Sequence, residues 1–397
     1  MAFYNSNLND GNKMNIGREQ ELFATNQAGF QKSTDLVLPP VNTYCSYLRN
    51  SPQTSIQNSS LFSSGTNTDY ILSCPGYTQN YWLNINVTNN AASASNILPC
   101  YLIDRVEVID TQGNIANTVY GDAIYLAKIH QSYDLCKRIA GIEGFNLATY
   151  GATSIAAGAT ADYWIKLPLA FLDQDFKMNI VENRLTIRIW WSNLGCSNVT
   201  NLYCNYADMI TSGFIVGARD ESLQCQWKCS KQLRWRYLSA YRACQQTTAM
   251  VPGGQYYAKL TSGNGLSAYL IFFIRPQGLT NSNLTSFVPI QSVQFLDRNG
   301  TLMGITHYSD ELQSIVSQKF VGDIFTINNS IYPIVFCIDT TVARNGGSSG
   351  FFQLTGNEQL LITMPSNLVA GNYVISCYSF EYNIAEMKNG RLSTVKN

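Results

Sequence analysis

The residue types that support metal binding or catalysis occur in only a few groupings along the chain, and the spacing within each grouping limits its chemistry. Cys225 and Cys229 are the one close pair among 11 cysteines. A structural zinc site requires a tetrahedral set of ligands. No second cysteine pair has suitable spacing, and His130 and His307 lie far off in sequence. We therefore predict no metal site and no cofactor.

A nucleophile motif, G-x-S-x-G, is matched by "GGSSG" at residues 346–350, with Ser348 at its centre. The nucleophile elbow of hydrolases needs an apolar strand before the serine and a helix after it. Here "TTVARN" precedes the motif and "FFQLTG" follows it, which predicts a Gly/Ser loop between strands. The motif therefore does not indicate a hydrolase.

Paired carboxylates, which glycoside hydrolysis requires, are represented by Asp173 with Asp175 and by Asp220 with Glu221. Adjacent positions on a strand point to opposite faces, so Asp220 and Glu221 are poorly arranged to act on one substrate. Solvated loop charges are the favoured interpretation. Phosphate-binding, dinucleotide-binding and zinc-protease motifs do not occur in the sequence. We predict no catalytic residue and a protein that is not an enzyme.

One basic and aromatic segment, "WKCSKQLRWRYLSAYR" at residues 227–242, has the composition of a surface that binds nucleic acid or anionic lipid headgroups. It also fits a strand that crosses between two domains and turns Leu233, Trp235 and Tyr237 inward, which is the favoured interpretation. Because 26 basic residues balance 26 acidic ones, we predict no sequence-specific binding of nucleic acid. The basic residues are Lys228, Lys231, Arg234, Arg236 and Arg242, and they interleave with Trp235, Tyr237 and Tyr241.

The composition is that of a protein that packs against neighbours. Only 13% of the 397 residues are charged, against about 25% in a typical soluble domain. Amides, hydroxyls and 24 tyrosines take their place, as at protein interfaces, which are poor in Lys, Glu and Asp. Residues 1–20 lack the apolar core of a signal peptide, and the cysteines are odd in number. We therefore expect synthesis in a cytoplasm and buried thiols rather than disulfides.

The elements that position these residues are read from the apolar pattern. Beyond residue 40, short runs alternate between apolar and polar positions and are separated by turn residues. In "YWLNINV", Leu83, Ile85 and Val87 share one face, and "RLTIRIWW" alternates in the same way. This period is typical of half-buried antiparallel strands in a sandwich or barrel. Helical patterns are few, at residues 122–139 and 309–320.

A strand and its turn occur twice. "LIDRVEVIDTQGN" at residues 102–114 aligns without a gap with "PIQSVQFLDRNGT" at residues 289–301. Asp110 and Asp297 occupy the same position, three residues before Gly113 and Gly300. An Asp side chain accepts backbone N–H groups in a turn, and Gly supplies a positive φ. We predict a structural role for both aspartates.

The neighbours of this strand repeat in the same order, so the sequence predicts two copies of one β-domain. We place an N-terminal arm at residues 1–35, the first domain at 36–240 and the second at 241–397. The matched segments are "YWLNINV" (from Tyr81) with "YLIFFI" (from Tyr269), the helical patterns at Asp122 and Asp310, "YWIKLPLAFL" with "IYPIVFCI", "RLTIRIWW" with "QLLITM", and "GFIVGA" (from Gly213) with "NYVISCYSF" (from Asn372).

The segments "TSIAAGATADYWIKLPLAF" (residues 153–171), "LIDRVEVIDTQGN" and "YSFEYNIAEMKNGRLST" (residues 378–394) resemble parts of the double jelly-roll major capsid proteins of tectivirus-type, membrane-containing icosahedral phages, in the PRD1–adenovirus lineage. The likeness spans most of the chain. It implies an all-β fold of two tandem eight-stranded jelly rolls of the viral coat type, with a few short helices in loops.

The resemblance also implies a function. A major capsid protein of this family forms homotrimers of pseudo-hexagonal outline, which tile an icosahedral shell around an internal membrane and the genome. The expected partners are other copies of the chain, minor capsid and vertex (penton) proteins, and the internal lipid membrane, contacted through the N-terminal arm. The expected location is the virion, assembled in the host cytoplasm. The residues alone leave two alternatives. One is a glycan- or receptor-binding β-sandwich protein such as a viral spike or a lectin. The other is an enzyme on a β-sandwich, which needs converging carboxylates that no spacing in the sequence predicts.

Overall fold

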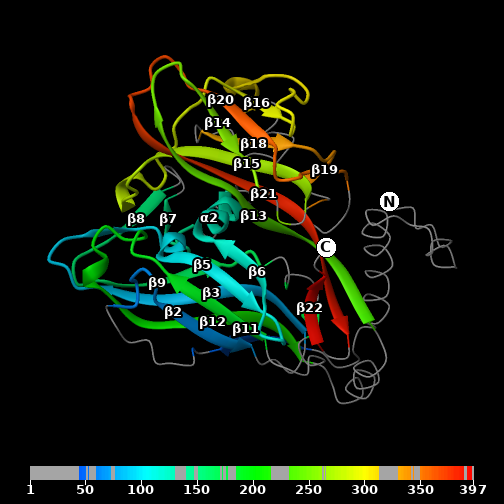
Figure 1. Ribbon diagram of the computed structural model, residues 1–397. Helices are drawn as coiled ribbons and strands as arrows, with labels where there is room; N and C mark the ends of the chain where they lie inside the picture. The colour runs from blue at the N-terminus through cyan, green and yellow to red at the C-terminus, as the bar shows by residue number, and fades with distance from the viewer. Residues whose placement is uncertain are drawn as a thin grey trace.

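In the computed structural model of the protein, the strands form two sandwiches of antiparallel sheets, one above the other in Figure 1. The residues that the structure describes are 44–50, 52, 60–72, 77–129, 140–146, 151–169, 172, 176–177, 185–215, 232–261, 263, 265–312, 330–340, 343, 349–388 and 391–395. Among these, no helix is both long enough and apolar enough to cross a membrane.

The first sandwich pairs one sheet in the order β1-β12-β3-β9 with another in the order β2-β11-β5-β6. The strands are β1 (Tyr44–Asn50), β2 (Asn67–Leu72), β3 (Tyr77–Asn89), β5 (Ile103–Ile109), β6 (Ile115–Tyr120), β9 (Thr160–Lys166), β11 (Leu185–Trp191) and β12 (Leu202–Ile215). The side chains of β11 alternate strictly between buried and half-buried, as its period predicts.

The second sandwich pairs a sheet in the order β13-β21-β15-β18 with one in the order β14-β20-β16-β17. The strands are β13 (Gln232–Met250), β14 (Gln255–Lys259), β15 (Leu266–Pro276), β16 (Ser292–Leu296), β17 (His307–Tyr308), β18 (Ile331–Val335), β20 (Gln359–Thr363) and β21 (Gly371–Lys388).

Both sandwiches have the same topology. When the strands of each are numbered 1 to 8 in chain order, the two sheets run 1-8-3-6 and 2-7-4-5 in the first sandwich and again in the second. This arrangement is a jelly roll, so the prediction of two tandem eight-stranded jelly rolls is confirmed. The predicted boundary between residues 240 and 241 lies inside β13, the first strand of the second jelly roll.

Short elements lie at the edges and in the connections. A small sheet of β4, β8 and β7 closes one end of the first jelly roll, and β10, β19 and β22 extend the larger sheets. The helical pattern at residue 122 gives a described helix, whereas the pattern at 309 is described only in its first turn. These elements are β4 (Ser95–Ile97), β7 (Phe145–Asn146), β8 (Gly151–Ile155), β10 (Phe176–Lys177), β19 (Phe352–Gln353), β22 (Arg391–Val395), α2 (Gly121–Ile129), α5 (Ser309–Glu311), η3 (Pro99–Leu102), η5 (Val199–Asn201) and η6 (Asn281–Asn283).

The repeated strand and turn have the same structure in both copies. The Asp110 carboxylate accepts the backbone N–H groups of Gln112 and Asn114 at 2.8 and 2.9 Å. The Asp297 carboxylate likewise accepts those of Asn299 and Thr301, both at 2.8 Å. The glycine three residues after each aspartate has a φ of 86° or 77°, a region that favours Gly. The structural role predicted for the two aspartates is confirmed.

The match of Tyr81 with Tyr269 is wrong by one residue. Tyr81 and Leu83 lie in the core of the first jelly roll, whereas Tyr269 lies on the face of β15 opposite to Leu270, which faces the core of the second. A shift of one residue moves a strand side chain to the other face. The structural counterpart of Tyr269 is therefore Trp82.

The match of Gly213 with Asn372 is also wrong. In the first jelly roll Met209 lies opposite Leu83, and in the second Ser379 lies opposite Leu270. Asn372 therefore corresponds to the start of β12, whereas Gly213 lies near its end. The strand that ends each jelly roll was identified, but its register was not.

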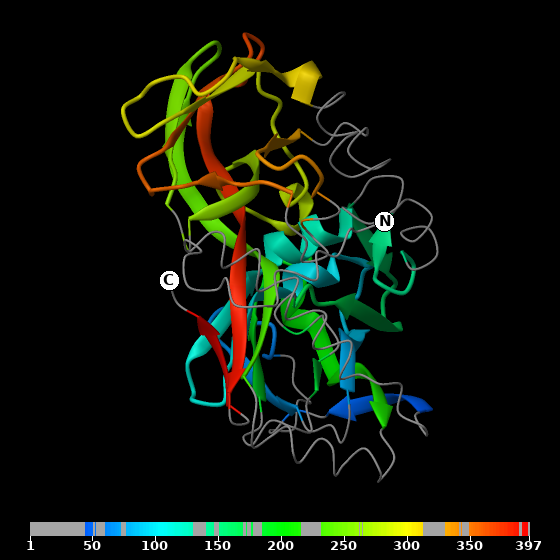
Figure 2. The ribbon, with the colours of Figure 1, turned by 90° about the vertical axis from the view of Figure 1, so that its right-hand side faces the viewer.

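The sheet that contains β13, β21 and β15 packs on both jelly rolls, and its strand β15 is buried on both faces. One face packs on the core of the second jelly roll through Leu270, Phe272 and Ile274. The other packs on the first jelly roll and helix α2, as Figure 2 shows for the long strand β21 in red. Every residue of β15 except Pro276 is buried, which explains the continuous apolar run "LSAYLIFFI".

Candidate functional site

The junction between the two jelly rolls holds aromatic side chains from both. Tyr125 of α2 lies 6.1 Å from Phe287 between ring centroids, and Phe287 lies edge-on to Phe273 of β15 at 5.2 Å. Aromatic pairs at these distances contribute beyond the area that they bury. The contact is therefore a packed interface rather than a flexible linkage.

A buried ion pair crosses this junction. The Arg275 guanidinium on β15 donates from Nη2 to Asp122 Oδ2 at 2.8 Å, and from Nη1 to Tyr101 Oη and Leu284 O, both at 3.3 Å. The Asp122 carboxylate also accepts the hydroxyls of Tyr101 at 2.8 Å and Tyr378 at 3.0 Å. Asp122 and Tyr101 belong to the first jelly roll, and the other residues belong to the second.

Burial and a neighbouring charge shift the pKa values of three members of this cluster. Burial, together with the adjacent Asp122 carboxylate, raises the pKa of Tyr101 and of Tyr378 well above the ordinary value. Burial alone would lower the pKa of Arg275, but the Asp122 carboxylate reverses the effect and raises it. Tyr101, Tyr378 and Arg275 therefore keep their protons near neutral pH and act as fixed hydrogen-bond donors in the contact between the domains.

A second contact across the junction involves Arg242 of β13. Its guanidinium carbon lies 3.9 Å from the centroid of the Tyr120 ring, at the end of β6. A cation over an aromatic face is attracted to the ring by about 0.5–2 kcal/mol, depending on solvent exposure. Tyr120 is followed directly by α2, so this stacking and the Asp122 ion pair fix the same end of the first jelly roll.

A cavity of about 410 Å³ also lies at the junction. Its lining is largely apolar and comes from α2 and β9 on one side and from β13, β15 and β21 on the other. Lys128 and Glu143 form a buried ion pair at its wall, and the Lys128 ammonium lies 4.7 Å from the Phe145 ring centroid. These two charges neutralise one another, and Lys166 is a further cation among the lining residues.

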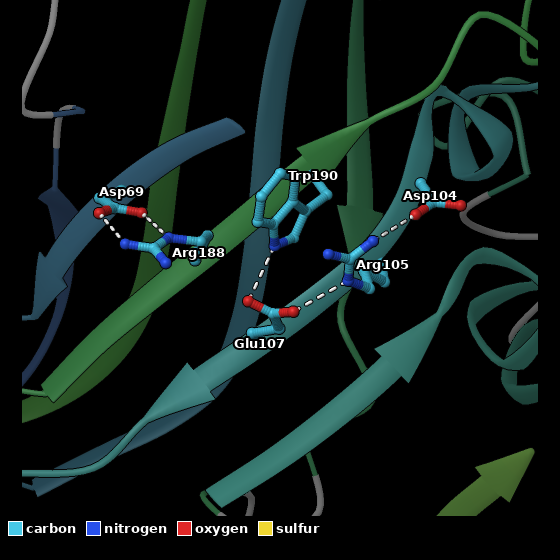
Figure 3. A network of polar contacts seen from close by, with 6 residues as sticks. All are labelled: Asp69, Asp104, Arg105, Glu107, Arg188 and Trp190. Carbon is cyan, nitrogen blue, oxygen red and sulfur yellow. Dashed lines mark hydrogen bonds and ion pairs between the residues drawn. The ribbon is translucent and has the colours of Figure 1, made fainter. Parts of the chain in front are cut away.

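A polar network lies on the outer face of the sheet β2-β11-β5-β6 (Figure 3). Arg188 forms a two-pronged ion pair with Asp69 at 2.7 and 2.8 Å. Glu107 accepts from Trp190 Nε1 at 2.8 Å and from Arg105 Nε at 2.9 Å. Asp104 completes the network by accepting from Arg105 at 3.0 Å. These side chains are partners of one another, either across neighbouring strands or, for Asp104, Arg105 and Glu107, along β5, which is a structural arrangement.

The matching face of the second jelly roll has a different chemistry. In the first, Asp69, Arg188 and Glu107 lie opposite one another in adjacent strands. In the second, the corresponding positions hold Tyr257, Leu361 and Gln294, and Tyr257 is 56% exposed. At these three positions one outer face is therefore charged and internally paired, and the other is uncharged.

The candidate catalytic and metal-binding residues fall outside the described residues. These are Cys225, Cys229, Ser348, Asp173, Asp175, Asp220 and Glu221. In the described part of the chain, no cluster of His, Cys, Asp and Glu is arranged to hold a metal ion. The cysteines with described side chains are buried free thiols, as expected, and are Cys100, Cys196, Cys204, Cys244, Cys337 and Cys377.

The basic and aromatic segment is described from residue 232 onward as β13, a strand that packs on both jelly rolls. Tyr237 is buried, as the interpretation of a crossing strand predicts. Arg236 is 1% exposed and lies over the Tyr382 ring at 5.1 Å, and burial lowers its pKa to about 10. Sequence reasoning missed the roles of Arg236 and Arg242 because a cation in an alternating strand gives no sign of the aromatic ring it contacts.

Comparison with known proteins identifies the fold. No protein-family model matches the chain, and no curated protein matches its sequence. The structure of PBCV-1 VP54 superposes with a TM-score of 0.68 at 11% identity, over 90% of this chain and 97% of that one. The Faustovirus major capsid protein gives 0.60 at 8% identity, over 87% and 91%. A chain of the Sputnik virophage gives 0.59 at 10%, over 89% and 88%.

The structural neighbours are double jelly-roll major capsid proteins of the PRD1–adenovirus lineage, the group that the sequence resembles. At identities this low the likeness defines the fold and nothing more. The chain is an all-β double jelly roll of the viral coat type.

Proposed function

We propose that this protein is a viral major capsid protein and not an enzyme. The observation that carries the proposal is the identical strand order of the two jelly rolls, in a fold that superposes on capsid proteins over most of both chains. The junction supports it, because its buried polar groups, among them the Arg275–Asp122 ion pair, join the two domains.

The proposed unit of assembly is a homotrimer of pseudo-hexagonal outline. The contact within one chain is head-to-tail, since it uses one surface of the first jelly roll and a different surface of the second. Head-to-tail contacts between similar units generate a ring when the rotation closes. Three chains contribute six jelly rolls, so a closed ring of three chains has near-sixfold symmetry, a shape that tiles a facet.

In the proposed virion such trimers form an icosahedral shell around an internal membrane and the genome. The N-terminal arm, residues 1–35, contacts the lipid. Minor capsid and vertex proteins bind the trimers at places where the regular array of trimers on the shell is interrupted. Assembly takes place in the host cytoplasm. The outer sheet faces differ between the two jelly rolls, with an Arg188–Asp69 ion pair in the first where the second has Leu361 and Tyr257, so the perimeter of the trimer alternates in chemistry.

The experiment is to measure the mass of the purified full chain by light scattering coupled to size exclusion. A trimer has three times the chain mass of 44.2 kDa, about 133 kDa, and electron microscopy of that fraction then shows a hexagonal outline. A protein that stays monomeric at the highest soluble concentration contradicts the proposal and favours the glycan-binding alternative, which a glycan array then tests.

A further inference from the structure

The junction within the chain uses only half of the surfaces that the internal repeat provides. The first jelly roll contributes Tyr120 and Asp122, where β6 runs into α2, and the second contributes the far face of the sheet β13-β21-β15-β18. Because the jelly rolls share one topology, the second also has an end where its fifth strand runs into a helix. The first also has a corresponding far face, on the sheet β1-β12-β3-β9.

The first of these remaining surfaces centres on Tyr308. Tyr308 ends β17 and is followed by α5, just as Tyr120 ends β6 and is followed by α2, and Asp310 corresponds to Asp122. Tyr120 is stacked under a guanidinium, whereas Tyr308 is 59% exposed. Apolar side chains around it are exposed as well, with Ile305 at 59% and Met303 at 40%. An aromatic and apolar patch of this kind is typical of a protein interface.

The second remaining surface holds a cation close to the matching place, on the same edge strand. Since the spacing from Val87 to Ile103 equals that from Ile274 to Ile290, the repeat equates Asn84 with Ile271. Ile271 pairs with Tyr378, and Tyr378 pairs with Arg242. In the first jelly roll Asn84 pairs with Asp208, and the Arg49 guanidinium lies 2.8 Å from the Asp208 carboxylate.

Arg49 lies on the corresponding edge strand, where it pairs with Ile210, two residues along from Asp208. Positions two apart on a strand share a face, and the Arg49 guanidinium reaches back to the Asp208 carboxylate. It also lies over the Tyr206 ring at 5.7 Å. Its side chain is 51% exposed, so one face of the guanidinium remains open to a further ring.

We propose that Tyr308 of one copy of the chain stacks on Arg49 of the next, repeating between chains the contact of Tyr120 with Arg242 within the chain. The inference rests on the proposed trimer and adds to it the surface and the residue pair that close the ring. Three such contacts form per trimer. The Asp208 carboxylate beside Arg49 holds the guanidinium in place for the incoming ring.

Disulfide trapping tests the placement directly. The double variant Arg49→Cys with Tyr308→Cys, oxidised at neutral pH and run on a non-reducing gel, is expected to give covalent dimers and trimers. The matched control joins Arg49→Cys to Tyr257→Cys, because Tyr257 is similarly exposed at 56% but lies on β14, at the opposite edge of the sheet that contains β17. The control is expected to stay monomeric on the gel, as is the unsubstituted chain.

A binding measurement gives an independent result. A cation–π contact is worth about fivefold in a binding constant, so Tyr308→Ala is expected to lower the trimerisation constant about 100-fold for three contacts. Arg49→Ala is expected to lower the trimerisation constant by a similar factor. Combining Arg49→Ala with Tyr308→Ala is expected to lower it little further, because either substitution alone already removes the contact. Two results overturn this inference but leave the proposed function. One is a trimer in which no disulfide forms between positions 49 and 308. The other is a trimerisation constant that Tyr308→Ala does not change. A monomeric unsubstituted protein overturns both.

Discussion

Removing the negative charge from the buried cluster between the jelly rolls is expected to cost much of the stability of the junction. Asp122→Asn keeps the size of the side chain but leaves the Arg275 cation without its counter-ion. The Arg275 side chain is 2% exposed, so water cannot replace the lost partner. Removing one partner of a buried ion pair costs about 3–5 kcal/mol.

The two tyrosine hydroxyls add to this cost. Tyr101 and Tyr378 both donate to the Asp122 carboxylate, and a hydrogen bond to a charged group is worth about 1.5–3 kcal/mol. The amide oxygen of Asn retains part of that, so we expect a total loss of about 4–6 kcal/mol. A free energy of unfolding of about 5–15 kcal/mol is typical of a domain, so the variant is expected to fold only marginally.

The assay is urea unfolding followed by circular dichroism, with the free energy taken from the midpoint and slope. The matched control is Asp69→Asn, which breaks the Arg188 ion pair on the outer face, where the side chains are 33% and 29% exposed. Pairs this exposed contribute about 0–1 kcal/mol. If Asp122→Asn is no more destabilising than Asp69→Asn, the junction does not depend on this charge and the reasoning is wrong.

Three further predictions concern the thiols, the repeated turn and the cavity. Burial raises the pKa of Cys100 and of Cys204 to about 12, from 9.0, so the folded state retains these protons longer. Stability is then unaffected by these thiols below pH 9 and falls as the pH rises from 9 to 12, by about 1.4 kcal/mol per pH unit for each thiol. Urea midpoints at pH 8 to 11 measure the slope, and an equal slope in Cys204→Ala contradicts this. Asp297→Ala removes both turn hydrogen bonds and is expected to cost about 1–2 kcal/mol in thermal unfolding, whereas Asp297→Asn, which keeps an acceptor, is expected to cost less than half as much. Ala127→Leu places apolar volume in the cavity at the junction and is expected to add about 0.5–2 kcal/mol to the urea-derived stability, while a loss of stability would show that the cavity cannot accept a larger side chain.

Local signals in the sequence were sufficient to predict the strands and the repeat. The alternation in "RLTIRIWW" is a property of a strand with one buried face, and the Asp–Gly spacing around Asp110 and Asp297 is a property of one turn. Both signals depend only on residues a few positions apart, which is why the sequence reveals them. The structure confirms both.

Register and long-range pairing could not be predicted in the same way. The one-residue error at Tyr269 arose because β15 is buried on both faces. The apolar pattern therefore does not distinguish the residues that face the core of the second jelly roll from those that face the first. The stacking of Arg242 on Tyr120 and the pairing of Arg275 with Asp122 join residues more than a hundred positions apart. Nothing near any of these residues in sequence identifies the partner.

The sheet β13-β21-β15-β18, which packs on both jelly rolls, affects the order in which the chain folds during synthesis. Tyr378, Tyr382 and Leu392 belong to the core that the first jelly roll shares, and Leu392 exchanges hydrogen bonds with Thr111 in the turn after β5. Domains usually fold as they leave the ribosome, the N-terminal one first. Here apolar residues of the first domain stay exposed until β21 and β22 have been synthesised and have packed on it. The chain therefore cannot assemble with other copies before its C-terminal residues have been translated.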